Sequence, residues 1–216
     1  MLQLIAFAST SPVDFSFHIS DFIFHIFSRG HMKKLFLPLI LIAALSVGCL
    51  NVQNKTYTFK LNPDGTGSGS IFFYNIHSSD EDDRDVSFKD FGTLVTDYIE
   101  GTTFDDENPD WNITKKDLFE QDGVLCGKVE FTFANMNAAK LYRTANCDCA
   151  PILLLPGALD ESLVENNGNA VELGDAQVIE WPADVKEITY KTEVTSDTEN
   201  VRNLVEHYKT WKKTQK

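Results

Sequence analysis

The chain has 216 residues, and its 32 aspartates and glutamates against 19 lysines and arginines give a net charge of −13 at pH 7. This acidic balance argues against a nucleic-acid partner, because the phosphates of nucleic acids are bound by clustered lysine and arginine. It also argues against peripheral docking of the chain on anionic lipid.

Residues 1–31 are rich in phenylalanine and have no helical period. We expect this segment to be a non-native upstream extension and Met32 to be the true start. The reason is that residues 29–31 can be encoded by a purine-rich ribosome-binding sequence just before the Met32 codon. The alternative is a genuine N-terminal tail.

Residues 32–48 have the organisation of a secretory signal. Lys33 and Lys34 form a short cationic start, and the uncharged apolar run at 35–47 is too short to span a bilayer permanently. The run ends on small residues immediately before Cys49, as a signal peptidase requires near its cleavage site.

The segment Leu45-Ser46-Val47-Gly48-Cys49 resembles the lipobox of bacterial lipoproteins, with serine at a position where leucine is commonest. The resemblance implies that Cys49 is lipidated and becomes the N-terminus. Acyl chains would then anchor the protein to a membrane of the cell envelope without a transmembrane helix. In a cell with two membranes, the absence of aspartate after the cysteine implies the outer membrane.

We expect residues 49–54 to form a short linker that holds the domain close to the membrane, since five extended residues reach about 17–18 Å. The remainder, 55–216, is long enough for one domain with its own core. The first expected elements are strands at 55–61 and 70–76, joined by a turn at 62–65. Glycines 65, 67 and 69 suggest a bulge where the second strand begins.

An acidic loop at 79–85 leads to an expected helix that opens with a capping box, Ser87 and Asp90, and ends at Gly101. A second hairpin is expected from strands at 111–120 and 124–133, with Phe131 and Phe133 facing inward. A short helix at 136–143 should follow it.

A third hairpin is expected from 163–165 and 170–173 around the turn at 166–169, followed by strands at 177–181 and 187–194. The final helix should open at Ser196 with Glu199 completing a capping box. The element order predicts an α+β fold, in which an antiparallel sheet built from hairpins carries helices packed on one face.

Three cysteines follow Cys49, and outside the cytoplasm a disulfide can persist. We expect Cys126 to be bonded to Cys147 or to Cys149, because a bond between the two adjacent-but-one cysteines would be strained. The histidines are too far from these cysteines in sequence to complete a ligand set, so no metal or other cofactor is expected.

Two apolar regions are candidates for contact with a partner. The run at 151–156 is bounded by prolines, which favours a short edge strand or loop that is either buried core or an exposed patch. The final helix carries Trp211 among several lysines, which either suit the helix dipole or contact lipid head groups or the cell wall. The candidate contact residues are Ile152, Leu153, Leu154, Leu155 and Trp211.

No Gly-x-Ser-x-Gly or His-Glu-x-x-His motif is present, so no catalytic residues are proposed. We expect a lipid-anchored envelope protein with a non-catalytic binding or scaffolding role, whose partner is an envelope protein or the cell wall. The first hairpin and Trp181-Pro182 also resemble small bacterial lipoproteins of unknown function. The alternative is an envelope hydrolase that uses paired carboxylates.

Overall fold

The computed structural model describes residues 50–79, 84–144, 147, 149–159, 161–173, 176–195 and 201–215, all within one compact unit, Val47–Lys216. The expected upstream extension, the signal segment and Cys49 lie outside the described residues.

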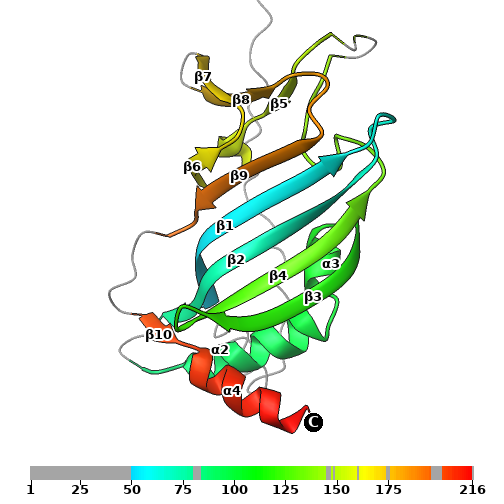
Figure 1. Cartoon of the computed structure of the whole chain (residues 1–216). Helices are drawn as coiled ribbons and strands as arrows, with labels where there is room; N and C mark the ends of the chain where they lie inside the picture. The colour runs from blue at the N-terminus through cyan, green and yellow to red at the C-terminus, as the bar shows by residue number, and fades with distance from the viewer. Residues whose placement is uncertain are drawn as a thin grey trace, which may run out of the picture. The chain divides into compact units, whose positions relative to one another are not determined.

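Antiparallel strands dominate the fold, and seven of the described strands form the main sheet. These are β1 (Leu50–Leu61), β2 (Gly67–Ser79), β3 (Trp111–Gln121), β4 (Val124–Phe133), β6 (Ser162–Asn166), β9 (Glu187–Glu193) and β10 (Val201–Asn203). Their order is β3-β4-β2-β1-β9-β6, and β10 pairs with the end of β2 (Figure 1). A smaller sheet, in the order β5-β8-β7, contains β5 (Ile152–Leu154), β7 (Asn169–Leu173) and β8 (Ala176–Trp181).

The described helices are few and short. They are α2 (Ser87–Thr93), the π-helical η1 (Leu94–Ile99), α3 (Thr103–Glu107), the 3₁₀ turn η2 (Pro156–Leu159) and α4 (Val205–Thr214). The predicted antiparallel sheet is therefore confirmed, in a mixed fold dominated by strands. No helix in the described part of the chain is long and apolar enough to cross a membrane.

The first predicted hairpin is confirmed, but both of its strands are longer than expected. Residues 50–54 are not a linker, because they belong to β1 and Leu50 pairs with Ser78 of β2. Leu50 and Val52 alternate with polar residues, and both pack against a cluster of buried apolar side chains. Because of this alternation, β1 begins at Leu50, the first described residue.

The glycines at the start of β2 allow close packing rather than a bulge. A Cβ atom on Gly67 would lie 2.4 Å from the Phe133 ring and 2.4 Å from the carbonyl oxygen of Lys60. A Cβ atom on Gly69 would lie 2.5 Å from the Phe131 ring. The register between β2 and β4 shifts later, between Phe73 and Ile76. The predicted bulge is therefore wrong in its position.

The second predicted hairpin, β3 with β4, is also confirmed, and Phe131 and Phe133 are buried as expected. They belong to the larger of two core clusters, which joins the main sheet to the smaller one. Its largest members are Tyr57, Phe59, Phe131, Phe133, Trp181 and Tyr190. The second cluster joins the main sheet to the helices through Ile76, Phe91, Leu94, Val95, Leu125, Leu204, Val205 and Tyr208.

The helix predicted after the acidic loop forms, but its N-terminus differs from the expected capping box. The N-cap is Val86, and the cap makes no side-chain hydrogen bond. The Asp90 carboxylate is buried instead, where it accepts a 2.5 Å hydrogen bond from the hydroxyl of Ser78. The helix then widens to a π-helix at Leu94.

The other two predicted helices are corrected. Residues 136–143 form turns, because Lys140 has a left-handed backbone with φ +57° and interrupts the helical path.

The final helix begins at Val205 rather than at Ser196, since Val201–Asn203 pair with the end of β2. The side chain of Asn203 accepts a 2.8 Å hydrogen bond from the Val205 amide, which satisfies one donor at the start of α4. Ser196 and Glu199 lie outside the described residues.

The third predicted hairpin is wrong, because its two strands belong to different sheets. β6 pairs with β9, whereas β7 pairs with β8. Asn167, between them, accepts hydrogen bonds from the Trp181 indole at 2.8 Å and from the Thr189 amide at 2.9 Å. The turn-like sequence therefore connects β6 of the main sheet to β7 of the smaller sheet, and we call this connection the crossing. The strands predicted at 177–181 and 187–194 are present as β8 and β9.

The predicted pairing of Cys126 is not found, since Cys147 is bonded to Cys149 and Cys126 is a buried free thiol. Cys126 lies near the end of the sheet where β4 begins. Cys147 lies five residues after Tyr142, which pairs with Leu153 of the smaller sheet. The predicted bond to Cys147 or Cys149 would therefore have joined the main sheet to a segment attached to the smaller one.

Cys126 should resist alkylation in the folded protein, because burial excludes reagent and raises the pKa of its thiol. Without reductant, one iodoacetamide adduct on Cys126 should appear only after denaturation, as measured by peptide mass spectrometry. Absence of that adduct after denaturation would instead support a disulfide from Cys126.

Candidate functional site

A cavity of about 380 Å³ lies against β1, with side chains from α3, β3 and the segment before β6 around it. Its most polar part is formed by Glu161, whose side chain is only 5% exposed, together with Lys55 and Tyr57 of β1. Phe104, Trp111 and Leu159 are among the apolar residues of its lining. We call this cavity the polar compartment.

The Glu161 carboxylate is bound by three donors of the protein, which are Lys55, Tyr57 and Thr192. Oε1 accepts hydrogen bonds from Lys55 Nζ at 2.6 Å and from the Tyr57 hydroxyl at 3.1 Å. Oε2 accepts from the same tyrosine at 3.2 Å and from the hydroxyl of Thr192. The Tyr57 hydroxyl has one hydrogen, which the two carboxylate oxygens share, so three donors hold this side chain in one orientation.

The register of the sheet assembles this group. Tyr57 of β1 lies opposite Tyr190 of β9, and the two rings stack with centroids 4.7 Å apart. Two positions away, Lys55 lies opposite Thr192 on the same face. Glu161 immediately precedes β6, which pairs with β9, and it reaches both of the inner strands.

Burial raises the pKa of Tyr57 and Tyr190 well above the usual tyrosine value, and the nearby Glu161 carboxylate raises both further. Since unfolded tyrosine ionises near pH 10, the stability due to these neutral hydroxyls is complete below about pH 10 and is lost as the pH rises further. Tyrosinate absorbance should therefore show that both ionise only when alkaline pH unfolds the domain. Ionisation of every tyrosine near pH 10, with the fold intact, would contradict this.

A second cavity of about 310 Å³ follows the π-helix η1 and is mainly apolar. Its lining includes Leu94, Tyr98 and Ile99 from η1, together with Val52 and Leu118 from the sheet. We call it the apolar compartment. Single-turn π-helical segments occur often at functional sites, because the wider turn changes the direction of the side chains that follow.

The two compartments share part of their walls. Lys55, Phe73, Phe104 and Glu107 line both of them. Lys116 of β3 links the sheet to α3, which contributes Phe104 and Glu107 to the shared wall. Its ammonium group donates to the Asp105 carboxylate and, at 2.9 Å, to the Gly101 carbonyl. The arrangement places a polar and an apolar cavity side by side, which suits a ligand with one polar and one apolar part.

The candidate contact residues from the sequence do not form a common surface. Ile152 and Leu154 are buried in the core and Leu153 is half-buried, so the core interpretation of this run holds for them. Leu155 is 41% exposed. Trp211 is half-buried and packs against the rings of Phe91 and Tyr208. Cys49 lies outside the described residues.

The residues of both compartments were not predicted from the sequence. One signal was present, since Lys55 is a charged residue on the same face of its strand as Tyr57 and Phe59. A lysine at an inward position requires a partner, and Glu161 supplies it. Nothing in the local sequence marks Glu161, because it lies in one of several acidic stretches.

Comparison of the chain with protein-family models, with curated proteins and with solved structures gives no match. Among the described residues, no group of three or more histidine, cysteine, aspartate or glutamate side chains could hold a metal ion.

Proposed function

We propose that this chain is a lipid-anchored protein of the cell envelope that binds a small amphipathic molecule carrying one alkyl or acyl chain. The observation that carries the proposal is the pair of adjoining compartments with different polarity. The apolar compartment would take the chain of the ligand, and the polar compartment would take its head group.

The size and composition of the compartments support this function. Each reaches the lower end of the range for small-molecule sites, about 300 Å³. The helical residues Leu94, Tyr98 and Ile99 provide apolar contact for the chain of the ligand. In the proposal, η1 and α3 pack on one face of the sheet and close the site over the ligand.

The head group would meet a different set of side chains. Lys140 and Asn108 line the polar compartment, together with Glu107, and their donors and acceptors can orient a polar head. Glu161 acts in this proposal as a fixed part of the wall, because three donors of the protein already bind its two oxygens.

Filling the apolar compartment tests the binding proposal. In the variant Ile99→Trp, a half-buried residue of the lining becomes a much larger one, whereas Val164→Trp adds the same ring at an exposed position of β6. We expect cis-parinaric acid, a fluorescent fatty acid, to bind the native protein and to bind Ile99→Trp at least about tenfold more weakly, a difference of about 1.4 kcal/mol. Equal binding by both variants, or none by the native protein, would refute the proposal.

The intact mass of protein extracted from membranes tests the anchor. The expected mass is that of a chain from Cys49 to Lys216 with acyl groups on Cys49. A mass that includes residues 1–31 and lacks acyl groups would refute both the anchor and the start at Met32.

The alternative, a hydrolase with paired carboxylates, would use Glu107 and Glu161, which both line the polar compartment. We favour binding because a catalytic carboxylate must have an oxygen turned toward the substrate. The oxygens of Glu161 instead accept from Lys55, Tyr57 and Thr192.

A further inference from the structure

One end of the main sheet gathers segments from four distant parts of the sequence. Leu50, at the start of β1, pairs with Ser78 near the end of β2, and β10 pairs with the same part of β2. The β3–β4 turn lies at this end too, because Asn203 of β10 donates a 2.8 Å hydrogen bond to the carbonyl of Gly123. We call this the anchor end, since Leu50 directly follows Cys49 in sequence (Figure 1).

The most exposed large hydrophobic side chain among the described residues lies at the anchor end. Phe88, in the first turn of α2, is 79% exposed. Its ring centroid lies 5.8 Å from that of His207 in α4, so the two helices are neighbours. Exposure of most of a phenylalanine ring to water is unfavourable relative to its burial.

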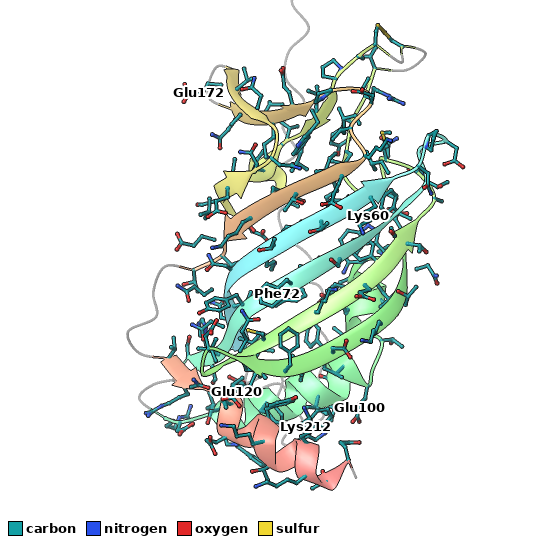
Figure 2. All side chains as sticks on the ribbon, viewed as in Figure 1. Lys60, Phe72, Glu100, Glu120, Glu172 and Lys212 are labelled. Carbon is teal, nitrogen blue, oxygen red and sulfur yellow. A yellow bond between two sulfur atoms is a disulfide. The ribbon has the colours of Figure 1, made fainter. Side chains whose placement is uncertain are left out.

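The charge of the neighbouring helix is opposite to that of the chain as a whole. α4 has three lysines and one glutamate, a net charge of +2, whereas the chain has a net charge of −13. Lys209 is paired with Glu120 and Glu206, so Lys212 and Lys213 are the lysines of α4 that can meet an anionic surface. Lys212 and Lys213 are exposed in its last turn, and Figure 2 shows Lys212 on α4, away from Lys60 near the β1–β2 turn. A local cluster of lysines attracts anionic phospholipid head groups even on an acidic protein, because screening limits the effect of distant charges to about 10 Å.

We propose that the anchor end docks on the surface of an anionic phospholipid bilayer. Phe88 inserts its ring between the head groups, and Lys212 and Lys213 contact the phosphates. The inference rests on the proposed acylation of Cys49, which brings this end of the domain to the membrane. The docking fixes the orientation of the domain, so that the compartments beside η1 are held next to the bilayer from which an amphipathic ligand would come.

The experiment uses the full protein, purified from membranes with its own acyl groups and reconstituted in vesicles of phosphatidylcholine and phosphatidylglycerol. The variant Phe88→Trp adds a fluorophore at the docking position, and Tyr142→Trp adds one at an exposed aromatic position near the smaller sheet, where Tyr142 pairs with Leu153. We expect lipids with brominated acyl chains to quench the emission added in Phe88→Trp and to leave the emission added in Tyr142→Trp unchanged.

The outcomes separate the docking from the anchor. If Phe88→Trp floats with the vesicles but its added emission is not quenched, the protein is anchored and the docking proposal is wrong. If the protein carries no acyl groups and does not float, the anchor is wrong, and the docking proposal falls with it. Equal quenching of both variants would also overturn the docking.

A second pair of variants tests the lysines without changing the aromatic ring. In the Phe88→Trp background, Lys212→Glu with Lys213→Glu should reduce the quenching in vesicles that contain phosphatidylglycerol and leave it unchanged in phosphatidylcholine alone. Lys60→Glu, exposed at the opposite end of β1, should have no effect in either vesicle. Quenching that is insensitive to Lys212→Glu with Lys213→Glu would overturn the assigned role of the lysines.

Discussion

Replacement of Glu161 by alanine is expected to destabilise the domain by about 3 kcal/mol, because it leaves the buried partners of the carboxylate without an acceptor. Lys55, Tyr57 and Thr192 would lose that acceptor together. The Lys55 side chain is only 24% exposed, so water compensates for the loss only in part. Urea denaturation followed by circular dichroism measures the effect.

Glu165→Ala is the matched control, since Glu165 is an exposed glutamate on the adjoining strand β6. We expect this change to alter the free energy of unfolding by less than about 0.5 kcal/mol. Equal effects of the two variants would mean that the Glu161 network contributes nothing beyond an ordinary surface charge.

Trp181→Ala is expected to destabilise the domain by about 3–5 kcal/mol, the usual cost of truncating a buried aromatic ring to a methyl group. Trp181 is 1% exposed and packs in the cluster that joins the two sheets. Its indole also donates to the side chain of Asn167 at the crossing between β6 and β7. The midpoint of urea denaturation should fall accordingly.

Trp211→Ala provides the comparison, because this tryptophan is half-buried at the edge of the second cluster. Its removal should cost less than half as much as removal of Trp181, since less apolar area returns to water. A larger effect at Trp211 than at Trp181 would contradict the assignment of the core.

Local sequence signals were sufficient for the first two hairpins. Each has alternating apolar residues on both strands and a short turn that contains glycine, so all the information lies within about 25 neighbouring residues. The crossing at Asn167 and Gly168 has the same local signals but a different outcome. A Cβ atom on Gly168 would lie 2.6 Å from the Trp181 indole nitrogen, so this glycine is required by a distant side chain and not by a turn.

The start of α4 also depends on a distant part of the chain. Ser196 and Glu199 have the spacing of a capping box, but Val201–Asn203 pair with β2, more than a hundred residues earlier in the chain. Tertiary pairing of this kind overrides a local preference of about 1 kcal/mol. The polar compartment could not be predicted from the sequence for the same reason. Lys55 and Glu161 are brought together only by the pairing of β1, β9 and β6.

The position of β1 within the main sheet has a consequence for the folding of the chain. β1 is the first described strand, yet it lies in the interior of the sheet between β2 and β9. Until residues 187–193 have been synthesised, the edge of β1 that will meet β9 has no partner in the sheet. Contacts between such distant segments slow folding, because closing a long loop costs entropy before the pairing stabilises it. A nascent chain therefore exposes an unpaired strand edge for most of its synthesis, which makes protection against aggregation most important before β9 arrives.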